Sequence, residues 1–377
     1  MLTVPSADEL QDSKSAIDRV RDIEPDDLLG RRPVRLGEAG GGAVLAGKVV
    51  LITGAGGSIG SELCRQVARF RPSRLVLYGL SEFNLDTIEQ DFGERFPDLP
   101  LVRVLGDVKD LPHMRHTFAQ WQPKVVFHAA AFKHVPLMEE DHNALAALRN
   151  NTLGTYHAAL AATEVGAERF VFISTDKAVN PTNVMGATKR AAELVISSMA
   201  TEHQGTRFMA VRFGNVLGSN GSVIPKFKEQ IARGGPVTVT HPDIIRYFMT
   251  IPEAARLVIQ AAAIGETGQV LVLDMGEPVR IVDLARDLIR LSGHSVDEIP
   301  IIFSGLRPGE KLFEELLAGG DTTLPTLISR LRVAQLQDDG GQGRVLTSLM
   351  AFGEAAHADD AAVRAWLQQT VPEYGPV

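Results

Sequence analysis

The residues of this chain with the clearest capacity for chemistry lie in one short segment. Asp176 and Lys177 are adjacent, and Lys189 follows Met185 by four positions. A carboxyl and an amine can serve as acid and base when burial or neighbouring charges shift their pKa values. A tyrosine at position 185 would form an acid/base pair with Lys189, but a thioether cannot carry a proton. We therefore expect proton transfer to depend on Thr175, Asp176 and Lys177.

These residues also have a purely structural interpretation. An isolated Asp–Lys pair is usually a solvated surface ion pair, and Met185 alone is typical of a helix packed on a core. Lys177 can act as a base only if its pKa is lowered, whereas Asp176 can act as an acid only if its pKa is raised. An ion pair between them would reverse both shifts. Adjacent strand residues also point to opposite faces, so the backbone must bend if both side chains are to reach a ligand.

The elements that must position this segment follow a regular alternation of strand and helix. Continuous apolar runs, each followed by a helix-forming segment, occupy residues 48–53, 74–78, 101–105, 124–128, 169–173 and 208–212. Such runs predict a parallel sheet covered by helices on both faces. The fold class is therefore α/β, a doubly wound parallel sheet of Rossmann type with a smaller C-terminal substrate-binding lobe. Asp176 and Lys177 follow the fifth strand, at the edge where this fold binds its ligands.

A glycine-rich loop joins the first strand to the first helix. Gly54, Gly57 and Gly60 form a G-x-x-G-x-x-G pattern that also contains Ser58 and Ile59. Glycines at these positions permit a tight turn and the close approach of a pyrophosphate, which the N-terminus of the helix then stabilises. A tight turn without a ligand is the alternative. The strand–loop–helix context favours a dinucleotide site.

Further residues fit the rest of a dinucleotide. Asp107, after the third strand, can accept a hydrogen bond from the adenine amino group. Gly79 stands where an acidic residue should bind the ribose hydroxyls, so either Glu82 takes that role or the role is unfilled. No Arg or Lys adjoins Gly79 to hold a 2′-phosphate, which favours NAD over NADP. The predicted cofactor-binding set also includes Ser81, Val108, Ala129, Ala130 and Lys189, the last as an anchor for the ribose and nicotinamide.

Several longer stretches resemble a known family. They are residues 52–60, 128–136, 174–181, 212–218, 241–250 and 306–312. On these stretches the chain resembles the extended short-chain dehydrogenase/reductases, and within them the polysaccharide-biosynthesis nucleotide-sugar 4,6-dehydratases that act on UDP-N-acetylglucosamine. Met185 resembles the residue of larger, membrane-anchored members that retain the configuration at C5. Their N-terminal membrane half is missing here, so we expect an excised catalytic half or a naturally short relative.

The resemblance implies an NAD-dependent hydro-lyase for bacterial surface polysaccharide or glycan biosynthesis. In that reaction the cofactor takes a hydride from sugar C4, water leaves across C5 and C6, and the hydride returns to C6. Lys177 is then the expected base at C5, and Asp176 the expected acid at the C6 hydroxyl. Thr175 would bind the C4 hydroxyl, whose proton a water beside Met185 would pass to Asp176 or solvent. The expected substrate contacts are Lys133, His134, Asn215, Val223, Ile224, Arg246, Arg307 and Glu310.

Other functions fit parts of the same pattern. A nucleotide-sugar 4-epimerase uses the same cofactor, but its chemistry normally depends on the missing tyrosine and has no use for an Asp–Lys pair. A C5-inverting dehydratase differs in stereochemistry. A non-catalytic NAD-binding regulator or scaffold would explain the missing tyrosine but not the retention of Asp176 and Lys177.

Composition limits the partners of the chain. A net charge of −8 over 377 residues argues against a nucleic-acid partner. A single cysteine permits no internal disulfide and fits a reducing compartment, and no apolar run reaches the roughly 18 residues of a membrane span. The ten histidines show no metal-ligand spacing, so no metal is expected. We expect a soluble, cytoplasmic chain without membrane contact of its own, placed at the inner face of the inner membrane if a membrane half has been removed.

Four regions are expected along the chain. They are an arm and linker (1–46), which includes the glycine-rich stretch 37–43; an NAD-binding domain (47–215), to which residues 266–276 return; a substrate-binding lobe (216–350); and a C-terminal helical tail (351–377). Within the lobe, helices are predicted over 282–291 and 310–317. The Ala- and Leu-rich helices over 141–165 and 187–202 are expected to pair in a homodimer.

Overall fold

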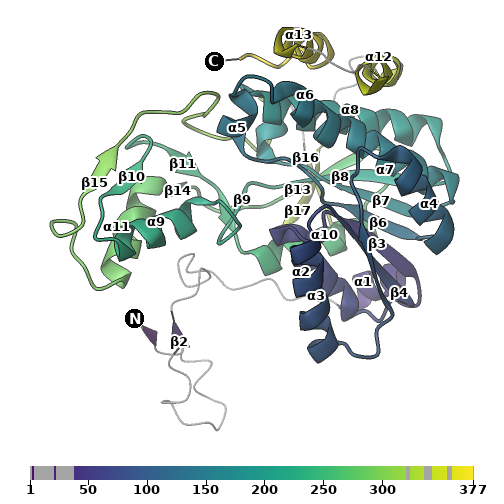
Figure 1. Ribbon diagram of the computed structural model, residues 1–377, viewed down its shortest axis with the longest axis horizontal. Coiled ribbons are helices and arrows are strands. Elements are labelled where there is room, and N and C mark those ends of the chain that lie inside the picture. The colour runs from purple at the N-terminus through teal and green to yellow at the C-terminus, as the bar shows by residue number, and fades with distance from the viewer. Residues whose placement is uncertain are drawn as a thin grey trace.

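The computed structural model describes residues 2–3, 21–22, 38–319, 323–334, 342–354 and 359–376, and it centres on a nine-stranded sheet (Figure 1). In spatial order the strands are β16 (Thr323–Pro325), β17 (Leu331–Ala334), β13 (Gln269–Leu273), β8 (Arg207–Arg212), β7 (Arg169–Ile173), β6 (Val125–His128), β3 (Val49–Thr53), β4 (Arg74–Gly79) and β5 (Leu101–Leu105). The strands from β13 to β5 are parallel, and β17 and β16 extend one edge antiparallel. The predicted doubly wound, mostly parallel sheet is confirmed.

Helices cover both faces of this sheet, as Figure 1 shows. One face carries α1 (Glu38–Leu45), α2 (Ser58–Ala68), α3 (Glu82–Arg95) and α10 (Ile251–Ile264). The other carries α4 (Leu111–Trp121), α5 (Val135–Glu139), α6 (Ala144–Ala147), η4 (Leu148–Leu153), α7 (Gly154–Glu164) and α8 (Val184–Glu202). Strands buried between two helical layers must be apolar on both sides, which is why their sequences read as continuous apolar runs.

A smaller lobe lies beside the sheet domain, on the left in Figure 1. It contains the strand pairs β9 (Asn215–Val216) with β12 (Phe248–Met249), β10 (Val237–Val239) with β15 (Ile301–Phe303), and β11 (Ile245–Arg246) with β14 (Val279–Arg280), together with helices α9 (Val223–Ala232) and α11 (Ile281–Leu291). Phe227, Leu284 and Leu288 belong to a hydrophobic core of its own. The lobe therefore forms a second wall that can face the sheet domain.

The lobe is smaller than the predicted range 216–350. Helix α10 packs against α1 and α2 in the sheet domain, and β13 joins the sheet, as expected for residues 266–276. Strands β17 and β16 extend the sheet edge, which the sequence analysis did not predict. The predicted boundary was wrong because the chain crosses between the two bodies several times.

The glycine-rich stretch 37–43 is not the linker that we expected. From Glu38 it is part of helix α1, whose Val44 and Leu45 are buried. A Cβ added to Gly41 would lie 2.7 Å from the ring of Phe70 and 3.1 Å from Ile259, so glycine permits close packing between helices here. The remainder of the predicted arm lies outside the described residues, apart from the strand pair β1 (Leu2–Thr3) and β2 (Arg21–Asp22).

The helix predicted over 310–317 is also wrong, whereas the one predicted over 282–291 is confirmed as α11. Residues 310–317 form bends and irregular loop. The Arg246 guanidinium donates to the carbonyl oxygens of Lys311 (2.8 Å) and Leu312 (3.2 Å), and the Ile245 N–H also donates to the Leu312 carbonyl (3.2 Å). Carbonyls that a helix would use internally are thus taken by a neighbouring strand.

Two helices near the C-terminus, α12 (Gln342–Glu354) and α13 (Asp360–Thr370), cover α8 (top of Figure 1). Ion pairs hold this layer in place: Arg190 to Glu373 at 2.5 Å and Arg364 to Glu139 at 2.9 Å. The predicted helical tail is confirmed by α13, and α12 starts before it. Much of α8, expected to pair with a partner's helix, is buried within this chain, and the homodimer stays a prediction.

The described helices were also compared with the requirements of a membrane span. Among the residues of the described ranges, no helix is both long enough and apolar enough to cross a bilayer.

Candidate active site

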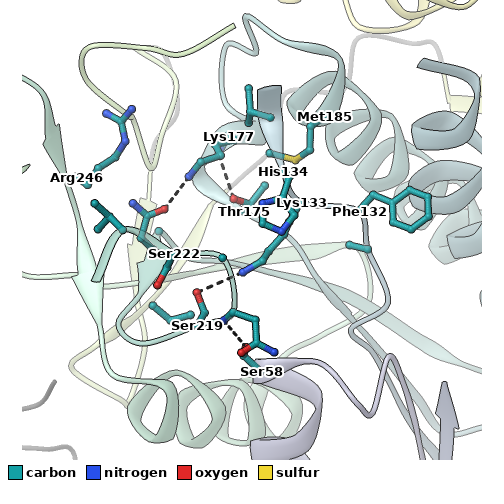
Figure 2. Close-up of a pocket in the computed structure, with 18 of the residues that line it drawn as sticks. Ser58, Phe132, Lys133, His134, Thr175, Lys177, Met185, Ser219, Ser222 and Arg246 are labelled. Atoms are coloured by element: carbon teal, nitrogen blue, oxygen red, sulfur yellow. Dashed lines mark hydrogen bonds between the residues drawn. The ribbon is translucent and has the colours of Figure 1, made fainter. Parts of the chain in front are cut away.

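One cavity of about 610 Å³ lies between the carboxyl ends of the central strands and the lobe (Figure 2). Strands β3 and β6 are neighbours, yet the chain leaves β3 in one direction along the sheet and returns through β6 in the other. A crevice outside such a switch point is where this fold binds ligands. The predicted site residues on its wall are Gly57, Ser58, Ile59, Gly60, Ala129, Lys133, His134, Thr175, Lys177, Met185, Lys189, Asn215, Val223, Arg246, Arg307 and Glu310.

The glycine-rich loop has the geometry that a pyrophosphate requires. Gly54 has φ +63°, and a Cβ there would lie 2.6 Å from the Ala130 nitrogen. A Cβ on Gly60 would lie 2.1 Å from the Gly54 carbonyl oxygen. Helix α2 begins directly after Gly57, which makes no side-chain cap, so the first N–H groups of the helix are available to a ligand. The loop therefore fits a dinucleotide, with Gly54 acting behind the cavity wall and not on it.

The predicted adenosine end lies beyond the cavity wall. Gly54, Ser81, Glu82, Asp107, Val108 and Ala130 do not line the cavity, and neither does Ile224 from the predicted substrate set. Ser81 caps α3 by accepting from the Asn84 N–H (3.3 Å), and Asp107 pairs with Lys109 (2.7 Å). Asn84 does line the cavity, and sequence reasoning missed it. The roles of Ser81, Glu82, Asp107 and Val108 stay predictions.

The backbone bends directly after β7, as the sequence required. The 3₁₀ turn η5 (Asp176–Ala178) follows Thr175, whose hydroxyl accepts from the Lys177 N–H at 3.4 Å. After this turn the charged ends of the two side chains meet, but the side chains differ in exposure. Lys177 lines the cavity, whereas the Asp176 side chain is 0% exposed and does not line it. The expectation that both side chains reach the sugar is therefore wrong for Asp176 in this structure.

Asp176 and Lys177 form the ion pair that would oppose the predicted pKa shifts. The Lys177 ammonium donates to Asp176 Oδ1 at 2.9 Å and to Asn215 Oδ1 at 3.0 Å. Thr175 also donates to Asp176 Oδ1, at 2.9 Å. Burial alone would lower the pKa of Lys177, but the carboxylates of Asp176 and Glu314 outweigh it and the pKa is raised. Lys177 is therefore held as a cation, contrary to the lowered pKa that we expected.

Lys189 has the opposite surroundings. Its ammonium nitrogen is buried, donates to the Ile173 carbonyl at 2.6 Å and lies 4.0 Å from the centre of the Phe172 ring. Burial lowers its pKa to about 7, with a partly opposing effect from Glu193. That carboxylate binds Arg212 (2.6 and 2.7 Å) and makes no hydrogen bond to the Lys189 amine among the described contacts.

Met185 lies on the cavity wall, with 2% of its surface exposed. Asn183 caps helix α8 by accepting from the Gly186 N–H at 2.8 Å, which fixes the start of the helix that carries both Met185 and Lys189. Figure 2 shows the Met185 sulfur on this wall. The arrangement agrees with the prediction that Met185 shapes the site without carrying protons.

Basic residues also line the cavity: Lys133 and His134 on the loop after β6, and Arg307 from the segment after β15. Lys133 donates to the Ser219 hydroxyl at 3.3 Å, a contact drawn in Figure 2. Burial, and then the charge of Lys177, lower the pKa of Lys133; burial, Lys133 and Arg307 lower that of His134. Arg307 is exposed and pairs with Glu310 at 3.1 Å. This cluster supplies local positive charge for a diphosphate despite the acidic total charge.

Arg246 differs from that cluster. Besides the carbonyls of Lys311 and Leu312, its guanidinium donates to the Ile245 carbonyl at 2.7 Å. It is 7% exposed. The side chain therefore fixes the lobe segment after Glu310, and most of its donors are not free for the forked phosphate contact that we predicted.

Sequence reasoning missed one carboxyl on the cavity wall. Glu314 is 8% exposed, lies 3.9 Å from Arg246, and has a buried Oε2 without a hydrogen-bond partner among the described residues. Burial raises its pKa, an effect that Asp176 reinforces and the nearby cations oppose. The only available signal was the four-residue spacing of Glu310 and Glu314, which the erroneous helix would have placed on one face.

The sequence matches the family model described as polysaccharide biosynthesis protein over residues 50–335. The chain is 52% identical over 318 residues to the capsular polysaccharide biosynthesis protein CapD of Staphylococcus aureus and 48% identical over 357 residues to the probable polysaccharide biosynthesis protein EpsC of Bacillus subtilis. These matches cover 84% and 94% of this chain but 53% and 59% of the relatives. It is also 30% identical to a Campylobacter jejuni UDP-N-acetylglucosamine 4,6-dehydratase (inverting), over 74% of this chain and 80% of that protein.

Solved structures share the fold. Pen from Bacillus thuringiensis superposes with a TM-score of 0.70 at 32% identity, over 78% of this chain and 91% of that one. The dTDP-glucose 4,6-dehydratase DesIV of Streptomyces venezuelae, solved with NAD bound, has a TM-score of 0.62 at 18% identity, over 86% and 97% of the two chains. At that identity the likeness concerns the fold alone.

Proposed function

The chain belongs to the polysaccharide biosynthesis protein family, and we propose that it removes water from UDP-N-acetylglucosamine. The product is the UDP-linked 2-acetamido-2,6-dideoxy-4-keto-hexose with the configuration at C5 retained. The observation that carries this proposal is one cavity shared by the glycine-rich loop, the cationic Lys177 and the basic cluster of Lys133, His134 and Arg307. The named dehydratase among the relatives supports the reaction class, and Met185 supports the retaining stereochemistry by resemblance.

When bound, NAD would supply the redox chemistry of the reaction, a hydride exchange with sugar C4 and C6. The chain's contribution is to hold the cofactor with the first turn of α2 against the pyrophosphate and Gly54 and Gly60 behind it. Lys189 lies on the wall between this loop and Thr175, in a position to contact the ribose. Its buried amine is the group on the wall whose pKa, about 7, suits a base near neutral pH. We assign it the proton of the C4 hydroxyl, through a water beside Met185.

Elimination requires a base for the C5 proton. Lys177 takes this role after passing its ammonium proton to Asp176 across their 2.9 Å contact. Substrate binding excludes water from the pair, which favours the neutral amine and carboxylic acid over the two ions. The neutral Lys177 removes the C5 proton and returns it to the same carbon after the hydride has reached C6. Asp176 thus acts as a proton store behind Lys177 and does not touch the sugar.

The proposal is tested by incubating the NAD-loaded chain with UDP-N-acetylglucosamine in deuterated water and following the sugar by NMR. We expect a C6 methyl group, deuterium at C5 and a C4 ketone, with the gluco configuration kept at C5. An inverted configuration at C5 would still support a 4,6-dehydratase, but it would contradict the proposed retention at C5. An epimerised sugar with its C6 hydroxyl intact would favour the 4-epimerase, and tight NAD binding without turnover of any UDP-sugar would favour the regulator.

A further inference from the structure

Departure of the C6 hydroxyl as water requires an acid, and the structure leaves that role open. Asp176, the acid implied by family resemblance, has a fully buried side chain behind Thr175. Its Oδ1 already accepts from Thr175 and Lys177, and its Oδ2 faces no hydrogen-bond donor among the described residues. A group that gives a proton to the sugar must lie within hydrogen-bond reach of it. The search for an acid therefore moves to other carboxyls on the cavity wall.

Glu314 meets this geometric requirement. It lines the cavity together with Lys177, and its carboxyl comes from the lobe, across from η5. Its Oε2 is buried and has no partner within the described part of the chain. A buried carboxylate oxygen without a donor is unfavourable, whereas a protonated carboxyl can give its hydrogen to a ligand. Glu314 thus differs from Asp176 in lining the space that the substrate would fill, with an oxygen free to carry a proton.

Of the carboxyl groups around the cavity, Glu314 is the one whose negative charge is least compensated by a paired cation. Asp176 is neutralised by Lys177 at 2.9 Å. Glu310 pairs with Arg307 at 3.1 Å and with Arg246 at 3.6 Å. Among the described residues, the cation within ion-pair distance of Glu314 is Arg246, at 3.9 Å, and that guanidinium is already engaged with Glu310 and backbone carbonyls. Lys177 also faces Glu314, but it is paired with Asp176. A buried carboxyl with so little compensation is more stable when protonated.

We propose that Glu314 is the general acid that protonates the departing C6 hydroxyl. In this step the C5–H electrons form the C5–C6 double bond while Lys177 takes the proton. The C6–O electrons leave with the oxygen, which accepts the Glu314 proton and departs as water. Glu314 is left as a carboxylate and regains a proton from solvent after product release. The inference rests on the proposed dehydration and names the group that completes it.

The charged groups facing Glu314 set the pH range in which this acid works. They are Lys177, Asp176, Arg246, Lys311 and Glu310. Burial raises the pKa of Glu314 and Asp176 raises it further, while the cations lower it, with a net upward shift. The proton is therefore present below the raised pKa and is lost as the pH rises through it. Dehydration should fall on the alkaline side of that value, and Glu314→Gln should remove this limb of the pH profile.

A leaving-group experiment tests the assignment with the full NAD-loaded chain. UDP-N-acetylglucosamine is compared with its 6-deoxy-6-fluoro analogue, because fluoride can leave without full protonation. The variants are Glu314→Gln, Glu314→Asp, Asp176→Asn and Lys177→Ala. Glu315→Gln is the matched control, since Glu315 is the exposed neighbour that pairs with Lys311. Methyl formation is followed by NMR and fluoride release with an electrode. UDP binding and thermal unfolding confirm that each variant is folded.

We expect Glu314→Gln to slow methyl formation by about 10²–10⁴-fold while fluoride release changes only several-fold. Glu314→Asp should recover part of the loss, and Glu315→Gln should resemble the parent chain. Equal losses with both substrates, or no loss with either, would overturn the assignment. A selective loss of methyl formation in Asp176→Asn would return the role to Asp176. If the parent chain forms neither product, the proposed dehydration itself fails, which is distinct from failure of one variant.

Discussion

Lys177 and Lys189 lie on the wall of one cavity, yet their surroundings favour opposite protonation states. Lys177 contacts the Asp176 carboxylate at 2.9 Å, and its pKa is raised. Lys189 lies against the Phe172 ring and a backbone carbonyl, and its pKa is lowered to about 7. The same residue type is a cation at position 177 and close to a neutral amine at position 189.

This difference shows how a site can work without a tyrosine at position 185. A phenol is useful because it can release and regain a proton, and a buried amine can do the same once its pKa approaches the working pH. The paired Lys177 becomes a base only after its proton moves to Asp176. Lys189 needs no such step. The two lysines are therefore suited to different proton transfers, Lys177 to that of the C5 proton and Lys189 to that of the C4 hydroxyl proton.

The largest effect is expected at Lys177. Lys177→Ala should reduce both deuterium incorporation at C5 and methyl formation by about 10³–10⁴-fold, because no other described amine approaches Asp176 within ion-pair distance. NAD binding, followed by calorimetry, should remain close to that of the parent chain. Normal deuterium incorporation in this variant would remove Lys177 from the base role.

Replacement of Lys189 tests the second lysine and its proposed role at the C4 hydroxyl. Lys189→Arg keeps a positive charge but cannot release a proton near neutral pH, so hydride transfer from C4 should slow by about 10²-fold. In the parent chain, single-turnover reduction of NAD, read by absorbance, should rise with a midpoint near the Lys189 pKa of about 7. This midpoint should be absent in Lys189→Arg. An unchanged pH profile in the variant would contradict the assignment, whereas weaker NAD binding alone would indicate an anchoring role.

The contrast between the two lysines should also appear in stability. For Lys189, the unfolded chain holds a proton between about pH 7 and 10.5 that the native chain lacks, so the free energy of unfolding rises with pH across that window. For Lys177 the pKa is raised, so its contribution is present below its ordinary pKa and is lost only at higher pH. In urea unfolding between pH 7 and 9.5, the free energy of unfolding of Lys189→Met should rise less steeply with pH than that of the parent chain. The slopes should differ by up to about 1.4 kcal/mol per pH unit. Lys177→Met should keep the rise, and equal slopes in the two variants would argue against the contrast.

Met185 should have the smallest effect on turnover. Met185→Leu conserves volume. Its activity should stay within about threefold of the parent chain's, and its free energy of unfolding within about 1.5 kcal/mol. Met185→Ala should lower the free energy of unfolding by about 2–5 kcal/mol through a cavity, because Met185 is 2% exposed, yet the folded fraction should remain active. A complete loss of activity in folded Met185→Leu protein would show that the thioether itself takes part.

Local patterns in the sequence predicted the features that depend on neighbouring residues. Strand periodicity located β3 to β8, and the glycine spacing located the turn that Gly54 and Gly60 require. The bend after β7 was expected if both Asp176 and Lys177 were to reach a ligand, because adjacent residues of a strand point to opposite faces. These features are determined within a few residues of chain.

Features that depend on distant contacts were not predictable in the same way. Gly41 lies in a helix because Phe70 and Ile259 pack against it, and no local signal separates that role from a flexible linker. Glu314 reaches the cavity because Arg246 holds the preceding carbonyls outside a helix. Asp176 is withdrawn from the cavity by a turn whose direction the sequence did not specify.

The layer of α12 and α13 over α8 has a consequence for the order of folding events. Arg190, one residue after Lys189, bonds to Glu373, which is 183 residues further along the chain. Long loops must close before such contacts form, so non-local contacts of this kind slow folding. After dilution from denaturant, far-UV circular dichroism should recover before the cavity binds nucleotide. The rate at which the last tertiary contacts form would then determine when a newly folded molecule can bind nucleotide.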